Sequence, residues 1–189
     1  MGAPRPAATP VPRDYQRSRG FDDVESLFVA RACEYKASVH LVESAPETIA
    51  STVDARGMRR MVAPDDVPES WLAAGVDWVR DAGMLDVATL DSCDGALTGC
   101  ALAIAETGTI VLDAGARQGR RVITLVPDYH LCVLRASQIV GTVPEAVAEL
   151  DPVRPLTFIS GPSATSDIEL DRVEGVHGPR TLDILLITS

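Results

Sequence analysis

Polar residues that could bind or activate a ligand are concentrated in three short segments of the chain. Glu106-Thr107-Gly108-Thr109 joins two apolar runs, and a stretch rich in hydroxyls, glycine and acids spans 160–169. The third segment, 175–180, places a histidine and an arginine among glycines and a proline. A strand that runs into a glycine turn and a helix start presents N–H groups and hydroxyls that bind anions. The sequence therefore predicts a site for a small anion or a nucleotide.

The candidate ligand-binding residues are the polar and glycine positions of these segments, together with a histidine that follows a Pro-Asp-Tyr turn. They are Glu106, Thr107, Gly108, Thr109, His130, Ser160, Gly161, Ser163, Thr165, Asp167, Glu169, His177, Gly178 and Arg180. An arginine on a constrained loop can hold a carboxylate or a phosphate through two parallel hydrogen bonds. Glu106 and His177 are the candidate catalytic residues, because carboxylates and imidazoles serve as bases and nucleophiles.

Each segment also has a structural interpretation, which the residues alone leave open. Gly108 could simply supply the positive φ of a tight hairpin. Ser166 and Glu169 form an S-x-x-E capping box for a helix over 167–173, and His130 could orient a turn. The sequence contains no Walker or dinucleotide glycine spacing and no recognisable Ser-His-Asp or Cys-His set. The residues alone therefore name no reaction.

Composition narrows the class of protein. The 189 residues, 46% apolar and 23% charged, suit one α/β domain with an ordinary core. A net charge of −10 with a single lysine, Lys36, argues against a nucleic-acid partner. No apolar run is long enough to cross a bilayer, and the amino end lacks a signal-like apolar stretch. A cytoplasmic location is therefore expected.

The cysteines are too scattered to suggest a metal site. The closest two, Cys93 and Cys100, stand seven residues apart, which is unlike the close pairs that hold zinc or an iron–sulfur cluster. We expect these two, together with Cys33 and Cys132, to be buried as small apolar residues. The sequence predicts no metal and no cofactor in this chain.

The apolar pattern predicts the elements that position these segments. Residues 1–20 form a Pro-rich arm without periodicity, expected to be poorly ordered, and residues 21–189 form the folded domain. Helices and strands alternate in the first half, which implies a largely parallel sheet with helices on its faces. The expected elements are a helix capped by Asp22 or Asp23, strand 39–42, helix 46–56, strand 60–63, short helix 68–74 and strand 76–80.

After Asp91 the pattern changes to short strands joined by tight turns, which predicts antiparallel hairpins. These strands are expected at 96–105, 110–112, 121–126 and 131–134. A helix over 144–150 follows, because proline is favoured in the first helical turn. Strands 156–159 and 181–188 are almost continuously apolar and are expected to be buried on both faces. The expected fold class is α/β with a mixed sheet.

Three motifs stand in a fixed order along the chain. They are Ile104–Leu112, Ile159–Ser163 continuing through Asp167–Glu169, and Gly175–Arg180. Together they resemble the signature of the LUD domain family, and within it the lactate-utilization protein C group (LutC, YkgG). The resemblance extends over residues 21–187. It implies a Rossmann-like three-layer α/β/α fold similar to the NagB, RpiA and CoA-transferase group. The amino end departs from the family pattern, because many relatives carry a longer helical lead-in.

The resemblance also implies participation in the bacterial oxidation of L-lactate to pyruvate, with iron–sulfur subunits as partners. The iron–sulfur clusters would lie in those partners, and this chain would be a non-redox subunit that binds a small anion or a nucleotide. The alternative is a stand-alone enzyme similar to CoA transferases and sugar-phosphate isomerases, with Glu106 as nucleophile or base and Arg180 holding the substrate. Either hypothesis is compatible with a homo-oligomer.

Overall fold

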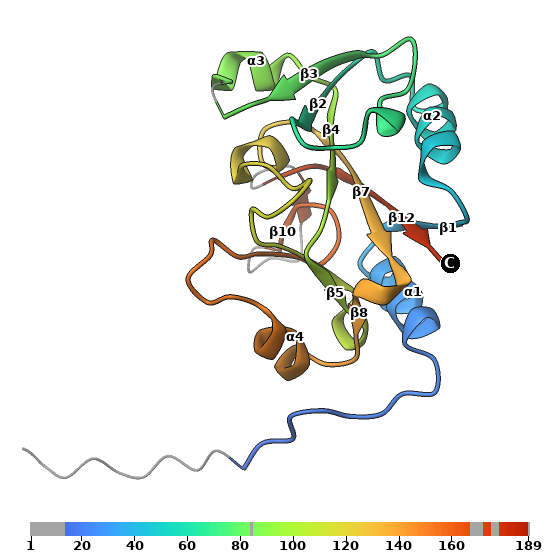
Figure 1. Ribbon diagram of the computed structural model, residues 1–189, viewed down its shortest axis with the longest axis vertical. Helices are drawn as coiled ribbons and strands as arrows, with labels where there is room; N and C mark the ends of the chain where they lie inside the picture. The colour runs from blue at the N-terminus through green and yellow to red at the C-terminus, as the bar shows by residue number, and fades with distance from the viewer. Residues whose placement is uncertain (1–13, 84, 167–171, 175–177, 189) are drawn as a thin grey trace, which may run out of the picture.

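A six-stranded parallel sheet forms the centre of the molecule (Figure 1). The computed structural model of the chain describes residues 14–83, 85–166, 172–174 and 178–188. All neighbouring strands in this sheet are parallel. In spatial order they are β1 (Ser38–Val42), β12 (Thr181–Ile187), β7 (Tyr129–Arg135), β4 (Gly95–Gly99), β2 (Arg60–Pro64) and β3 (Asp77–Asp81). The α/β class predicted from the sequence is confirmed.

A second, smaller sheet packs on one face of the central sheet. In spatial order its strands are β8 (Ile139–Val140), β5 (Leu102–Ile104), β6 (Thr109–Leu112) and β9 (Thr157–Ile159). β6 runs antiparallel to both β5 and β9, whereas β5 and β8 are parallel. A separate antiparallel hairpin consists of β10 (Ala164–Ser166) and β11 (Arg172–Glu174). The expected antiparallel hairpins therefore lie outside the central sheet.

Helices complete the layers. They are α1 (Val24–Glu34), α2 (Ala45–Ala55), α3 (Val87–Asp91) and α4 (Val143–Glu149), with the 3-10 helices η1 (Glu69–Trp71), η2 (Ala105–Thr107), η3 (Arg121–Thr124) and η4 (Ala136–Gln138). Asp23 caps α1 as predicted, because its carboxylate accepts the N–H of Ser26 at 2.9 Å. Thr142 and Glu145 form a capping box at the start of α4. Local capping chemistry thus fixes where these two helices begin.

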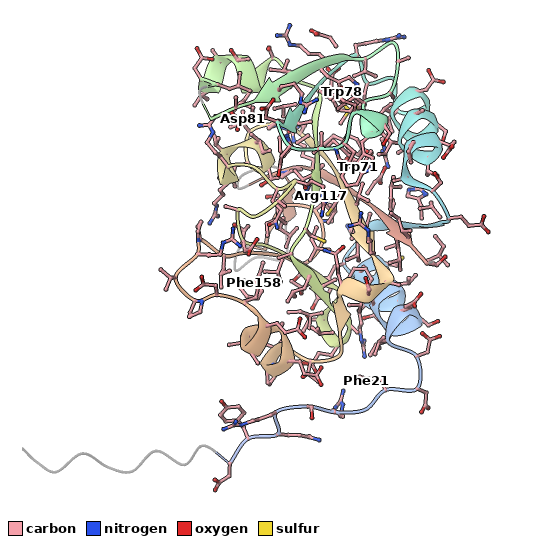
Figure 2. The ribbon with its side chains drawn as sticks, in the orientation of Figure 1. Phe21, Trp71, Trp78, Asp81, Arg117 and Phe158 are labelled. Atoms are coloured by element: carbon pink, nitrogen blue, oxygen red, sulfur yellow. The ribbon has the colours of Figure 1, made fainter. Side chains whose placement is uncertain are left out.

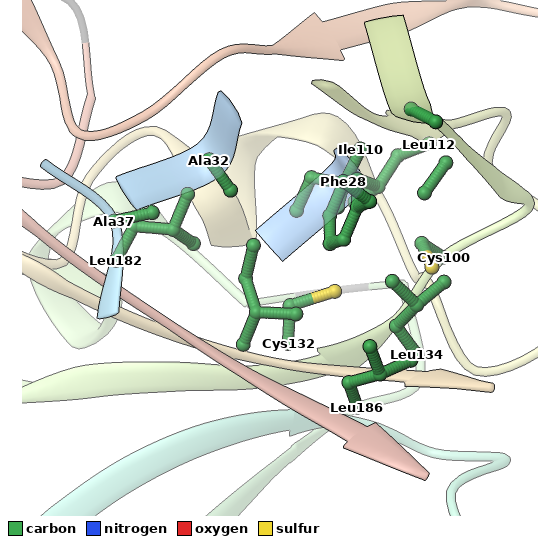
Figure 3. Close-up of a cluster of buried hydrophobic side chains, with 13 residues drawn as sticks. Phe28, Ala32, Ala37, Cys100, Ile110, Leu112, Cys132, Leu134, Leu182 and Leu186 are labelled. Carbon is green, nitrogen blue, oxygen red and sulfur yellow. The ribbon is translucent and has the colours of Figure 1, made fainter. Parts of the chain in front are cut away.

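Side chains alternate across β7 and divide the core into two layers. Tyr129 and Leu131 pack in the cluster that contains the buried face of α2. Cys132 and Leu134 pack instead with Phe28 of α1 and with the small sheet (Figure 3). This two-residue period is the geometry of a strand covered on both sides. The same period directs the side chain of His130, the second residue of β7, toward the layer that holds α1 and the small sheet.

The cysteines follow this layering with one exception. Cys93, Cys100 and Cys132 are buried as expected, but Cys33 is exposed. That expectation was wrong for Cys33 because its neighbour in α1, Ala32, faces the core and turns Cys33 toward solvent. Over the described ranges, no helix has the length and apolar character to cross a bilayer, and no three His, Cys, Asp or Glu side chains gather as metal ligands would.

The prediction of one strand over 96–105 was wrong. The chain forms β4 and β5 there, and the two strands belong to different sheets. Gln138 holds the break between them, since its side-chain Nε2 donates to the carbonyls of Cys100 at 2.8 Å and Ala101 at 3.1 Å. The predicted strand 121–126 was also wrong, because η3 occupies its first part. Strand 131–134 exists as part of β7 but lies in the parallel sheet rather than in a hairpin.

Two predictions near the carboxyl end also need correction. Strand 156–159 is β9, which is not buried on both faces, because Phe158 is 47% exposed on the small sheet (Figure 2). The predicted helix over 167–173 was wrong at its carboxyl end, where Arg172 and Val173 belong to β11. Ser166, its expected cap, lies in β10, and residues 167–171 fall outside the described residues. Strand 181–188 is confirmed as the buried β12.

Candidate functional site

A cavity of about 270 Å³ lies at the amino ends of β7 and β12, between the central sheet and β9. Its walls combine apolar side chains with hydroxyls, one imidazole and one guanidinium. The lining residues are Arg121, Thr124, Leu125, His130, Thr157, Phe158, Ile159, Ser160, Gly161, Pro162, Ser163, Gly178, Pro179 and Leu182. The second and third polar segments of the sequence therefore meet at one cavity.

His130 and Leu182 lie directly opposite each other in the register of β7 and β12, and both line the cavity. His130 is only 1% exposed, and its Nε2 lies 2.8 Å from the Thr98 hydroxyl oxygen. Burial lowers the pKa of His130 to about 4, because a charged imidazole loses hydration in the core. The ring is therefore neutral at pH 7 and offers one donor and one acceptor nitrogen.

A chain of hydroxyls connects the first polar segment to the second. The Thr107 and Thr109 hydroxyl oxygens lie 2.8 Å apart, and that of Thr109 lies 2.7 Å from the Ser160 hydroxyl oxygen. Thr109 is buried, whereas Ser160 lines the cavity. Hydrogen bonds along this chain orient the Ser160 hydroxyl before any ligand arrives. The first segment thus contributes to the cavity through Thr107 and Thr109 without lining it.

Two glycines bring the polar segments against the carboxyl half of α1. A Cβ on Gly108, whose φ is +59°, would stand 2.4 Å from the Ala32 backbone nitrogen. A Cβ on Gly161, whose φ is +84°, would stand 2.2 Å from the Tyr35 carbonyl oxygen. Both positions require glycine because of the backbone angle and because of the close approach. The hairpin interpretation of Gly108 is confirmed, since it lies between β5 and β6.

Arg121 is a cavity residue that the sequence did not single out. It begins η3, where a strand was predicted. The preceding residue, Arg120, holds the buried carboxylate of Asp81 through two bonds of 2.9 Å, and this pairing lowers the pKa of Asp81 despite its burial. The adjacent arginines therefore have different roles, and only one of them faces the cavity. The two consecutive arginines, Arg120 and Arg121, were the available signal in the sequence.

Glu106 lies apart from the cavity. One of its carboxylate oxygens accepts the N–H of Val143 at 2.8 Å, in the first turn of α4. The other lies 3.9 Å from a guanidinium nitrogen of Arg19. A carboxylate at a helix N-terminus is stabilised by the unpaired N–H groups there. Glu106 is thus bound to α4, beside a separate small depression that Arg19 and Thr142 also line.

Arg180 lies beside the cavity without being one of its lining residues. Its Nε is 3.5 Å from a carboxylate oxygen of Asp128, and both side chains are more than half exposed. Its neighbour Gly178 does line the cavity. Thr165 belongs to β10, and the remaining candidates, Asp167, Glu169 and His177, fall outside the described residues.

The carboxyl edge of the central sheet, where open α/β sheets usually bind ligands, is occupied by the loop over 113–120. The carbonyl of Arg117 accepts the N–H of Gly99 at 2.7 Å, and the N–H of Arg117 donates to Asp66 at 2.7 Å. Within the loop, Gln118 bonds both the backbone and the carboxylate of Asp113. The loop thus covers the carboxyl ends of β2 and β4, so the amino-edge cavity is the better candidate site.

Comparison with known proteins decides the family. The sequence profile of the LUD domain matches residues 26–187. The chain belongs to the LUD domain family. A lactate utilization protein C from Deinococcus radiodurans is 47% identical over 184 residues, which cover 94% of this chain and 84% of that protein. YkgG from Escherichia coli is 38% identical over 92 residues, which cover 44% of this chain and 39% of that protein.

The fold of this LUD domain has a counterpart among solved structures. The crystal structure of a DUF162 family protein from Deinococcus radiodurans superimposes with a TM-score of 0.73 and 41% sequence identity. The match covers 86% of this chain and 95% of that chain. The Rossmann-like α/β fold expected from the resemblance is thus confirmed.

The three motifs that carry the LUD resemblance have distinct structural roles here. The first places Gly108 against α1 and binds the start of α4 through Glu106. The second and third form one side of the cavity and are joined directly, because the N–H of Ser163 donates to the carbonyl of Pro179 at 2.7 Å. In this LUD domain the motif residues therefore build the cavity wall, while Arg121 comes from outside the motifs.

Proposed function

We propose that this protein acts in lactate utilization as a non-redox component that binds a small carboxylate anion in the cavity beside β9. Support for the process comes from the LUD domain family and from the relative named lactate utilization protein C, which matches 94% of the chain. Support for binding comes from the cavity itself. One observation carries that part of the proposal: a cation, hydroxyls and a neutral imidazole line a single small cavity.

The composition of the cavity walls fits a small organic anion. The Arg121 guanidinium would pair with a carboxylate through parallel N–H donors. The Ser160 hydroxyl, oriented by Thr109 at 2.7 Å, supplies a further hydrogen-bonding group. Leu125 and Leu182 provide apolar surface for a short carbon chain. A volume of about 270 Å³ exceeds what lactate or pyruvate alone requires, so ordered water or a larger anion would share the space.

His130 would contribute without adding charge. Because its pKa is lowered to about 4, the imidazole is neutral at pH 7, where lactate and pyruvate are anions. Its Nε2 is already paired with Thr98, which fixes the ring in one orientation. The positive charge that selects an anion would then come from Arg121 rather than from the imidazole.

Electron transfer belongs to other subunits in this proposal. The four cysteines are all free; Cys100 and Cys132 lie in one buried cluster, Cys93 is buried in another, and Cys33 is exposed. Lactate oxidation removes two electrons, which iron–sulfur partner subunits would accept. A stand-alone enzyme acting through Glu106 is disfavoured, because that carboxylate accepts the N–H of Val143 at the start of α4.

Calorimetric titration of the purified protein with L-lactate and with pyruvate tests the binding proposal. Arg121→Ala should weaken binding by about tenfold to a hundredfold, since hydrogen bonds to a charged group contribute about 1.5–3 kcal/mol. Arg180→Ala is the matched control, because it removes a neighbouring arginine that does not line the cavity. Its affinity should stay within about threefold of wild type.

Two results would contradict this proposal. One is that neither anion, at millimolar concentration, gives a heat of binding in the calorimetric titration or a chemical-shift change in NMR spectra of the protein. The other is equal loss of affinity in both arginine variants. Deletion of the gene tests the process separately, because a strain that grows normally on lactate without it would remove the role in lactate utilization.

A further inference from the structure

The two edges of the central sheet differ in how they are protected. The outer strand β3 carries Asp77, Arg80 and Asp81, and charged residues on an edge strand discourage pairing with another chain. The opposite outer strand, β1, reads Ser-Val-His-Leu-Val and contains no Asp, Glu, Lys or Arg. Leu41 in this strand is 62% exposed. The β1 edge therefore has the composition of a strand that pairs with a partner.

The unpaired side of the β1 backbone can be assigned from the existing bonds. Among the described strands, β1 pairs with β12 alone. The carbonyl of Val42 accepts the N–H of Thr188, so the backbone groups of Val42 point to β12. Because these groups alternate along a strand, those of His40 also point to β12. The N–H and C=O groups of Val39 and Leu41 therefore point away from the sheet.

We propose that two copies of this chain associate through β1, paired antiparallel about a two-fold axis at His40. In this register Val39 of one copy lies opposite Leu41 of the second copy, and each pair exchanges backbone hydrogen bonds in both directions. Such an interface is isologous, because the same strand serves both copies. The central sheets of the two copies become one continuous sheet.

The side chains on the α1 face suit this pairing. A groove of about 430 Å³ runs between α1 and β1, lined by Val29, Ala30 and Leu41 together with acidic and hydroxyl side chains at the start of α1. The two-fold axis is perpendicular to the sheet, so the α1 faces of both copies lie on the same side. Leu41 of each copy is then covered by Val39 and by the groove of the other. An exposed apolar groove becomes buried surface.

Charge is complementary at both ends of the paired strands. Lys36, the one lysine of the chain, precedes β1, and Glu43 follows it; both are exposed. Antiparallel pairing at His40 places Lys36 of one copy opposite Ser44 of the second copy, and Glu43 is the residue next to that Ser44. The two-fold axis repeats this contact at the other end. Parallel pairing of the same strand would instead bring like charges together at each end, which favours an antiparallel second copy.

On the α2 face of the sheet, His40 lies at the centre of the proposed interface. His40 lies on this face beside a second groove of about 430 Å³, lined by hydroxyls of α2 and by Arg56. At the two-fold axis His40 meets His40 of the second copy as a non-hydrogen-bonded pair, with Cα atoms about 4.5 Å apart. That spacing lies within the range that a disulfide can bridge. The register can therefore be tested by a single engineered cysteine.

The first test measures mass in solution by light scattering after size exclusion at tens of micromolar protein. Wild type is expected to be a dimer and Leu41→Lys a monomer, because two charges would face each other across the edge. Val147→Lys is the matched control, since Val147 is 60% exposed and its helix, α4, lies away from β1 (Figure 1). It should remain dimeric. A wild-type-like circular dichroism spectrum and a single cooperative melting transition of Leu41→Lys exclude unfolding as the cause.

The second test fixes the register. In a Cys33→Ser background, His40→Cys should form a disulfide-linked dimer on mild oxidation. Ser38→Cys should not, because it would lie opposite Val42, roughly 13 Å from its counterpart at about 3.4 Å per residue. A monomeric wild type overturns the proposal, even if β1 then proves to bind an iron–sulfur subunit. Equal cross-linking of both cysteine variants overturns it as well.

Discussion

The buried histidine of the cavity makes the stability of the protein depend on pH. The pKa of His130 is lowered from its ordinary value of 6.5 to about 4 by burial. Between these values the unfolded chain binds a proton at His130 and the folded chain does not. The free energy of unfolding therefore decreases as the pH falls through this interval. At about 1.4 kcal/mol per pH unit the full loss is about 3 kcal/mol, and it is complete near pH 4.

Replacement of His130 by glutamine isolates this effect. Glutamine keeps a polar group near Thr98 but does not titrate, so the variant should lack the His130 contribution while retaining every carboxylate contribution. Urea unfolding followed by circular dichroism at pH 7.5, 6, 5 and 4 gives both free energies of unfolding. The difference between wild type and variant should shrink by about 3 kcal/mol across this range.

Val153→Gln is the control, because it places a glutamine at a side chain that is 90% exposed and does not titrate. It should follow the pH dependence of wild type. Parallel curves for wild type and His130→Gln would show that the imidazole is hydrated or charge-paired in the folded protein. The description of a neutral, buried ring in the cavity wall would then be wrong.

Two further substitutions test the fold around the site. Asp183→Asn removes a fully buried carboxylate that accepts three hydrogen bonds from side chains. The free energy of unfolding in urea should therefore fall by about 3–5 kcal/mol. Asp128→Asn is the control, because Asp128 belongs to an exposed ion pair, and it should lower the free energy of unfolding by less than about 1 kcal/mol. Gly108→Ala should lower the melting temperature far more than Gly57→Ala, because both glycines have positive φ but only the first meets backbone within 2.5 Å.

Elements with strong local signals could be predicted from the sequence. Asp23 caps α1, and the apolar positions that follow it have the period of a helix. β12 is apolar except for Thr181 and Asp183 and is buried on both faces. In these cases capping chemistry and hydrophobic period agree with the tertiary environment, which is why the prediction holds.

Elements that depend on contacts distant in sequence could not be predicted. The apolar run over 96–105 gives no sign of the break that Gln138 stabilises from 37 residues further along the chain. Likewise the turn before β7 looked like a strand, because the bidentate pairing of Arg120 with Asp81 is invisible in the sequence. Hydrophobicity alone does not distinguish one strand from two that separate into different sheets.

In the candidate site, too, some features could be predicted from the sequence and others depend on contacts between distant residues. Ser160 and Gly178 both line the cavity, because the segment after β9 and the segment before β12 are joined by the backbone hydrogen bond from Ser163 to Pro179. Glu106 does not line it, since the N-terminus of α4 binds its carboxylate. Arg121 faces the cavity only because η3 replaces the predicted strand. Residue type could suggest which groups bind anions, but the direction of each side chain depends on the backbone around it.

The two strands that floor the cavity also carry a polar cluster on their reverse side. Tyr129 precedes His130 in β7, and Asp183 follows Leu182 in β12, so the side chains of Tyr129 and Asp183 point to the α2 face. There the Arg56 guanidinium donates to the Asp183 carboxylate at 2.6 and 2.7 Å, and the Tyr129 hydroxyl donates to it as well. A sheet one backbone thick transmits any shift between its faces. Substitutions at Arg56, which contacts Asp183 and Tyr129 on the α2 face, should therefore appear in a genetic screen alongside substitutions of the cavity residues.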